Sequence, residues 1–153
     1  MKGTIVKCTA ELVYSGFGRE KWETALKQAG LTPGMLILAT TDVDDAVFMK
    51  MLGALCRILN LTAPQLGDAF GDYWVNTFSQ KIYGDFYRES PDAKSLLVRM
   101  DEIHAMITST MKNARPPRFR YEWKSDSVLV MHYESKRGLV DVLVGLVRGV
   151  GRY

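Results

Sequence analysis

His104 places an ionisable ring on a helical stripe that otherwise holds Leu97, Met100, Ile107 and Met111. A lone histidine on an apolar face is usually a core residue whose ring bonds a backbone carbonyl. A neutral imidazole in an apolar pocket is also what a haem iron takes as its proximal ligand. No second histidine or carboxylate is spaced to complete a zinc site with it. A core histidine and a haem ligand therefore both remain open as interpretations.

A second group of polar side chains, Tyr133, Ser135 and Arg137, is spaced i, i+2, i+4. In an extended chain this spacing puts two hydroxyls and a guanidinium on the same side. Arginine offers a two-pronged fork to a carboxylate, and the hydroxyls add donors, so a ligand with paired carboxylates such as the haem propionates would be held well. The alternative is a solvated strand end with a surface arginine.

The elements that must position these residues are mostly helices. Apolar residues at helical spacing predict helices over residues 20–29, 42–60, 62–78, 90–113 and 138–150. Gly30 ends the first of these, and Thr62 to Gln65 has the form of a capping box at the start of the third. The double proline Pro116-Pro117 follows the fourth, which is the longest.

After the prolines the period changes to alternation. Residues 118–124 and 128–133 read as two antiparallel strands, and Ser125-Asp126-Ser127 supplies the turn between them. The order is a helical N-terminal two-thirds, a small antiparallel sheet and a C-terminal packing helix. We therefore predict an α+β fold in a single domain over residues 1–153.

The composition fits one globular domain of 153 residues. Hydrophobic residues make up 47% and charged residues 24%, which excludes a disordered chain. The net charge of +3 is interspersed, so no basic arm for nucleic acid stands out. No leader and no apolar stretch of the ~18 residues that a membrane span needs are visible. With only Cys8 and Cys56, far apart in sequence, we expect a cytoplasmic setting and no membrane insertion.

Four segments occur in one order along the chain: residues 1–6 (MKGTIV), 100–104 (MDEIH), 116–119 (PPRF) and Tyr133-x-Ser135-x-Arg137. Together they resemble the haem nitric oxide/oxygen binding (H-NOX) domain, the family of the haem domain of soluble guanylate cyclase. The resemblance covers essentially the whole chain. It implies a b-type haem buried between the helices and the sheet, with His104 as its proximal ligand.

The resemblance also assigns the other cofactor contacts. It implies that Tyr133, Ser135 and Arg137 hold the propionates and that Pro117 presses on the haem and keeps it non-planar. The complete set expected at the cofactor, besides His104 on the metal, is Ile5, Trp74, Phe78, Met100, Ile103, Pro117, Tyr133, Ser135, Arg137, Val142 and Leu146.

The distal residues bear on which gas is bound. Members of the family that hold O₂ resemble each other in a tyrosine five positions after the motif arginine, and here that position is Val142. Thr9 and Trp74 also match the distal wall and carry donors, but we expect them to pack. A lost donor of ~1–3 kcal/mol weakens O₂ binding about 5- to 150-fold. The expected ligands are therefore NO and CO, with O₂ excluded.

The leading hypothesis is a gas sensor and not an enzyme. As the resemblance implies, NO weakens or breaks the bond between the iron and His104, and movement of the haem and of the His104 helix carries the signal to a partner. In bacteria the partner is most often a histidine kinase, a cyclic-di-GMP enzyme or a chemotaxis transducer. Hydrolase motifs such as Gly-x-Ser-x-Gly or a phosphate loop are absent.

Two alternatives belong to other classes. One is a haem-free domain on the same scaffold that binds a small molecule or a partner. The other is a nucleic-acid binder in which cations alternate with aromatic residues, although an amphipathic strand with a charged outer face explains that pattern better. The residues concerned are Arg115, Arg118, Arg120 and Lys124 with Phe119, Tyr121 and Trp123.

The sequence departs from the family pattern at two points. The family usually continues past the helix over 138–150 with two further strands, whereas this sequence stops at Tyr153. Either the sequence is a truncated piece or the sheet is a reduced form, and in both cases we expect an unpaired hairpin edge. Some members carry a cysteine-zinc cluster, which Cys8 and Cys56 cannot supply. These two cysteines are most simply buried small hydrophobes, with a thiol redox role as the alternative.

Overall fold

The computed structural model describes residues 1–153 and contains helices, one π-helix and a two-stranded antiparallel sheet, which confirms the α+β class. The helices and strands are α1 (Gly3–Phe17), α2 (Arg19–Gln28), α3 (Asp45–Leu59), α4 (Ala63–Tyr73), the π-helix η1 (Trp74–Phe78), α5 (Gln80–Arg88), α6 (Ala93–Val98), α7 (Met100–Thr108), β1 (Arg118–Ser125), β2 (Val128–Glu134) and α8 (Val140–Arg152).

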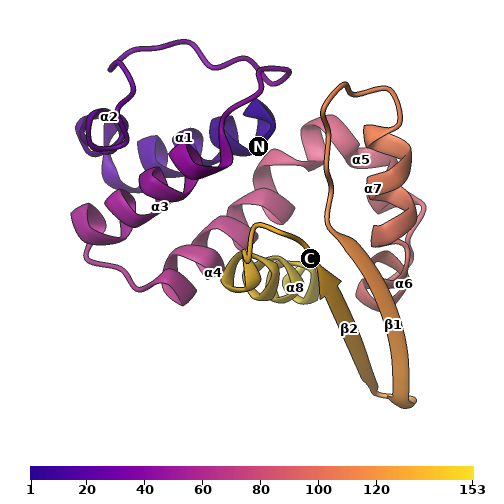
Figure 1. Ribbon diagram of the computed structural model, residues 1–153. Coiled ribbons are helices and arrows are strands. Elements are labelled where there is room, and N and C mark those ends of the chain that lie inside the picture. The colour runs from indigo at the N-terminus through magenta and orange to yellow at the C-terminus, as the bar shows by residue number, and fades with distance from the viewer.

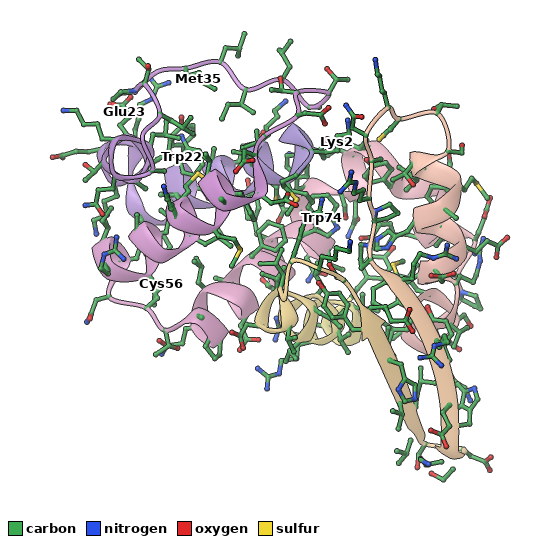
Figure 2. All side chains as sticks on the ribbon, viewed as in Figure 1. Lys2, Trp22, Glu23, Met35, Cys56 and Trp74 are labelled. Carbon is green, nitrogen blue, oxygen red and sulfur yellow. The ribbon has the colours of Figure 1, made fainter.

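The elements form two groups joined by α4 and α8 (Figure 1). Helices α1, α2 and α3 lie on one side, and α5, α6, α7 and the β1–β2 hairpin lie on the other. The largest buried cluster holds the first group together around residues such as Trp22, Leu26, Met51 and Leu55. Trp74 lies at the centre of the molecule, between the two groups (Figure 2).

Local sequence signals explain where several helices begin and end. The helix expected from residue 42 begins at Asp45, because the side chain of Asp44 accepts hydrogen bonds from the backbone N–H groups that follow it. The same helix ends at Leu59 and is capped by Asn60, which has left-handed backbone angles. Thr62 and Gln65 form the predicted capping box of α4.

The single helix predicted over 90–113 is wrong, because the structure has two shorter helices, α6 and α7, in that range. Asp92 caps the first, and Arg99 ends it with φ −89° and ψ −7°. The Arg99 guanidinium reaches back to the Glu89 carboxylate (3.0 Å) and to the Ser90 hydroxyl (3.0 Å). At the far end the Thr108 hydroxyl donates to the His104 carbonyl at 2.7 Å, which competes with continued helix.

The predicted helix over 62–78 also changes character within its length. It is an α-helix only to Tyr73 and continues as the π-helix η1. A π-helix inserts an extra residue into the turn and frequently occurs at functional sites. Helix α1 was not predicted from the sequence, and it begins where Gly3 lies against the Leu38 carbonyl. A Cβ at Gly3 would lie 1.9 Å from that oxygen.

Helices α4 and α8 approach so closely that glycines form the contact. A Cβ at Gly145 would lie 1.9 Å from the Gly67 carbonyl oxygen, and a Cβ at Gly71 would lie 2.0 Å from the Gly145 carbonyl carbon. The ion pair between Arg148 and Asp68 (2.8 Å) joins the same two helices at the surface. This contact fixes the position of the α8 side chains relative to Trp74.

The β1–β2 hairpin has the predicted alternation. Phe119 pairs with Tyr133 and Tyr121 with Met131, on the face that turns towards α7. The strand edges are unpaired in this two-stranded sheet, as expected.

No single helix has the length and hydropathy of a membrane crossing. Only the pair Asp45–Leu59 and Ala63–Phe78, taken together across a 102° bend, meets those limits.

Candidate functional site

A cavity of about 290 Å³ lies between the two groups of elements. Its walls come from the start of α1, from α4 and η1, from α5, α6, α7 and α8, and from the hairpin with the segments that flank it. Most of the lining side chains are apolar. This volume lies near the lower end of the range of small-molecule sites, which is roughly 300–1,000 Å³.

His104 lines this cavity from α7. Burial lowers the pKa of its imidazole, while the Pro117 backbone oxygen and the Asp101 carboxylate act in the opposite direction without reversing the shift. The ring is therefore neutral at pH 7 and keeps one nitrogen lone pair. Its Nδ1 is buried without a hydrogen-bond partner. The ring packs on Phe119, with 5.6 Å between centroids.

Tyr133, Ser135 and Arg137 all line the cavity, but not on one extended strand. Strand β2 ends at Glu134, and the Arg137 backbone N–H donates to the Ser135 hydroxyl at 3.2 Å in a turn. The expected extended geometry over 133–137 is therefore wrong. The turn still brings the two hydroxyls and the guanidinium to the same cavity.

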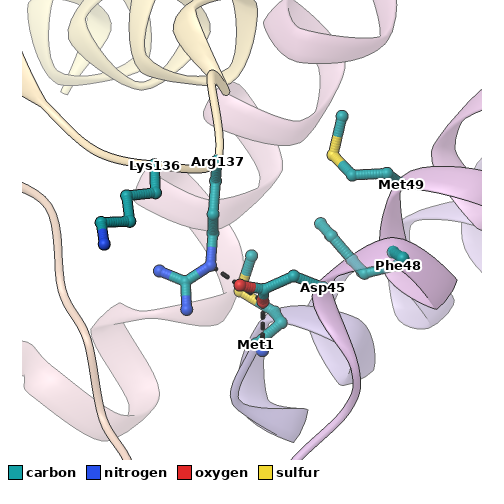
Figure 3. A pocket seen from close by; sticks show the side chains of 7 residues that line it. Met1, Asp45, Phe48, Met49, Lys136 and Arg137 are labelled. Atoms are coloured by element: carbon teal, nitrogen blue, oxygen red, sulfur yellow. Dashed lines mark hydrogen bonds and ion pairs between the residues drawn. The ribbon is translucent and has the colours of Figure 1, made fainter.

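The guanidinium of Arg137 donates hydrogen bonds to two groups of the protein. Its Nε donates to the Asp45 carboxylate at 2.9 Å, and its Nη1 donates to the Arg115 carbonyl at 2.6 Å. The same Asp45 oxygen accepts from the Met1 α-ammonium at 2.6 Å (Figure 3). Partial burial raises the pKa of Asp45, but these two cations outweigh it and leave the pKa lowered. Beside this ion pair lies a smaller pocket of about 160 Å³, against which Phe48 packs.

Four of the expected distal residues, Ile5, Trp74, Val142 and Leu146, line the cavity. Trp74 stacks between Phe70 and Phe78, with centroid distances of 5.9 and 5.5 Å. Phe78 itself is buried behind Trp74 and does not line the cavity. Thr9 also lies outside the lining.

Thr9 is 1% exposed, and its hydroxyl donates to the Ile5 carbonyl at 2.8 Å. This bond uses the only donor that the side chain has, which agrees with the expectation that Thr9 packs. Met100, Ile103 and Pro117 line the cavity as expected.

Several lining residues were missed from the sequence, chiefly aromatic ones on α5 and β1. Tyr83 and Tyr87 follow η1, and the Tyr87 hydroxyl lies 2.6 Å from the Ser79 hydroxyl. Phe119 is 6% exposed and contacts both His104 and Tyr133. The alternation of aromatic and charged residues over 118–124 placed Phe119 on the inner face of the strand. No local sequence pattern indicated that Tyr83 would line the cavity.

The donor set in this cavity fits a haem. An apolar chamber suits the macrocycle, and the neutral imidazole of His104 suits its iron. The His104 Nδ1 makes no hydrogen bond of good geometry, so the ring lacks the firm anchor that a purely structural core histidine usually has. Arg137 with the two hydroxyls offers donors to carboxylates at the same cavity.

Other ligand classes fit less well. No group of three His, Cys, Asp or Glu residues is arranged to hold a metal ion. Both cysteines are free, and burial strongly raises the pKa of Cys8. The cations proposed for nucleic acid are engaged elsewhere, since Arg118, Arg120 and Lys124 pair with carboxylates.

Comparison with known proteins agrees with this site. The sequence model of the family described as "Haem-NO-binding" matches residues 2–153. The chain belongs to this family, the H-NOX domains, which bind haem and sense gases. The curated relatives include the soluble guanylate cyclases gcy-32 (27% identical) and gcy-35 (24% identical) of Caenorhabditis elegans. Each match covers 99% of this chain but only 23% of the relative.

Solved structures show the same fold. An H-NOX mutant from "Cs" carrying 4-cyano-L-phenylalanine at site 5 superposes with a TM-score of 0.89 at 25% identity, over 99% of this chain and 81% of that one. An oxygen-binding H-NOX domain related to soluble guanylate cyclases, in its oxygen complex, superposes with a TM-score of 0.83 at 26% identity, over 99% and 80%. The family therefore includes a member that binds O₂.

Proposed function

We propose that this chain is a haem-b gas sensor that binds NO and CO, excludes O₂ and signals to a partner protein in the cytoplasm. The observation that carries the proposal is the neutral, partly unpartnered imidazole of His104 in an apolar cavity that also receives Arg137. Bound there, a ferrous haem supplies an iron that takes up diatomic gases. His104 would hold the iron, and Arg137, Tyr133 and Ser135 would hold the propionates.

The discrimination against O₂ rests on the distal side chains. Val142 has no hydrogen-bond donor, and the Thr9 hydroxyl is spent on the Ile5 carbonyl. Trp74 is fixed by stacking against two phenylalanines, which supports a packing role for its ring. A polar ligand such as O₂ gains more from a donor than NO or CO does, so this wall favours the latter two.

The output of the sensor is movement of helix α7. Release of His104 from a bound haem would leave α7 free to shift relative to Pro117 and the hairpin. That gives an element with two positions which the ligand biases. Suitable partners are a histidine kinase, a cyclic-di-GMP enzyme or a chemotaxis transducer, and the chain itself serves as a sensor domain and not as the catalyst.

Replacement of His104 tests the proposal, and His132 provides the matched control. The two are the only histidines, and His132 is 46% exposed on β2. His104→Gly should be purified without haem unless imidazole is added, whereas His132→Gly should keep its haem. Equal haem retention in both variants would refute the assignment. A wild-type protein that stays colourless after expression with haem precursor would support the haem-free alternative.

A further inference from the structure

Asp101 lies one helical turn before His104 on α7 and binds three residues of β1. Its carboxylate accepts two hydrogen bonds from the Arg118 guanidinium, at 2.8 and 2.6 Å. The same carboxylate accepts the Phe119 backbone N–H at 2.8 Å. The Asp101 backbone N–H donates to the Tyr121 hydroxyl at 3.2 Å. One residue of the His104 helix thus holds the first half of the strand.

These are the only hydrogen bonds that join the hairpin to a helix, since its other polar side chains pair within the hairpin. Arg120, for example, pairs with Glu134 across the strands at 2.7 Å. A second attachment lies nearer the tip, where the Lys94 ammonium of α6 sits 4.3 Å from the centroid of the Trp123 ring. The hairpin is therefore carried by α6 and α7 (Figure 1).

Phe119 connects this attachment to the imidazole. Its backbone is held by Asp101, while its ring lies 5.6 Å from the His104 ring and 6.0 Å from the Tyr133 ring. Phe119 is 6% exposed, so its ring cannot turn away into solvent. A displacement of His104 meets this ring directly.

The attachment is also suited to persist while α7 moves. A bidentate arginine–carboxylate pair combines two parallel bonds with geometric specificity. The Asp101 side chain is 24% exposed, less than that of Arg118 at 60%. The Arg118 guanidinium and the Phe119 N–H hold the pKa of Asp101 far below its usual range, so it stays ionised at any physiological pH.

We propose that Asp101 is the positioning residue that couples α7 to the β1–β2 hairpin, so that displacement of His104 is delivered to the hairpin as a movement of the strands. This inference rests on the proposed function for the displacement itself. The coupling, however, is a property of contacts between Asp101, Arg118 and Phe119 that exist without any ligand.

The test compares Asp101→Asn and Arg118→Gln with the control Arg120→Gln, which removes an arginine from the same strand without touching α7. The full-length ferrous protein is followed by amide hydrogen exchange, with and without NO. Before NO is added, exchange at Phe119 should be about tenfold faster in Asp101→Asn than in the wild type, because a half-exposed charged bond is partly screened. Arg120→Gln should match the wild type.

After NO is added, exchange over residues 118–134 should change in the wild type and in Arg120→Gln. It should not change in Asp101→Asn or Arg118→Gln, even though the haem spectrum responds to NO as in the wild type. A merely structural role for Asp101 would leave that response intact. An unaltered hairpin response in both variants would overturn the coupling.

The failure of the proposed function has a different signature. A wild-type protein that shows no spectral response to NO would contradict the gas-sensing role. The exchange rate at Phe119 without NO would still decide whether Asp101 holds the strand. If Asp101→Asn does not fold, Arg118→Lys keeps the charge but loses the two-pronged geometry, and the same loss of response is expected.

Discussion

Gly145 is the position where one added carbon atom should perturb the cavity most. It lies on α8 opposite Gly67 of α4, and a Cβ built there would lie 1.9 Å from the Gly67 carbonyl oxygen and 2.8 Å from the Asp68 backbone nitrogen. Both obstacles are backbone atoms, so no side chain can rotate out of the way. In Gly145→Ala the two helices must therefore separate or shift along each other.

The expected cost follows from that geometry. Overpacking of a well-packed contact usually costs about 1–3 kcal/mol, and an obstacle made of backbone puts this case at the upper end. For a chain of this size, each kcal/mol lowers Tm by roughly 2–4 °C, so the fall should be about 6–12 °C. Since α8 carries Val142 and Leu146, haem retention should weaken as well.

The assay is thermal unfolding of Gly145→Ala beside the control Gly151→Ala. Gly151 lies on the same helix, and a Cβ there would meet nothing within 4 Å. Its substitution should leave Tm unchanged or raise it slightly, because alanine favours helix over glycine by about 1 kcal/mol at most. Equal Tm values for the two variants would refute the close approach of α4 and α8.

Four further outcomes are expected. Val142→Tyr should give a reduced protein that forms a persistent complex with O₂ in air; an unchanged spectrum would count against the distal argument. Arg137→Gln should release haem faster than the wild type in a transfer assay, and an equal rate would exclude its role at the propionates. Because the folded pKa of His104 is lowered, the haem-free protein should lose stability as the pH falls below about 6.5, its unfolded value, and His104→Gln should lack that part of the slope. In native protein a thiol reagent should modify Cys56 and leave Cys8 unreacted; rapid labelling of Cys8 would contradict its burial.

The sequence predicted those elements whose limits are set by neighbouring residues. Helix α2 ends at Gln28, two residues before Gly30, whose φ is +82°, and α4 starts at the capping box of Thr62 and Gln65. The hairpin follows from strict alternation, and its inward residue Phe119 is buried as the pattern indicates. In each case the deciding interaction lies within a few positions of the residue concerned.

Features decided by distant partners could not be predicted. Arg99 ends α6 while its side chain bonds Glu89, ten positions away. Arg137 is oriented by Asp45, which is 92 positions away in sequence. The sequence suggests that Arg137 binds a carboxylate, but it does not show that its Nε already donates to the Asp45 carboxylate and its Nη1 to the Arg115 carbonyl.

The candidate site shows the same division. Nearly all residues expected at the cofactor line one cavity, because the motif order reflects a fold that brings them together. Phe78 is the exception, since the π-helix turns it behind Trp74. The sequence showed Asp101 only as a member of the 100–104 motif. Its contacts with β1 could not be predicted, because their partners lie 17 or more positions further along the chain.

The most direct test of the central claim is the absorption spectrum of the purified ferrous protein before and after NO is added. Before addition we expect the spectrum of a histidine-ligated haem, and afterwards the spectrum of a haem without that ligand. The first spectrum should be lost in His104→Gly and kept in His132→Gly. A wild-type protein without haem, or one whose spectrum NO leaves unchanged, would contradict the account.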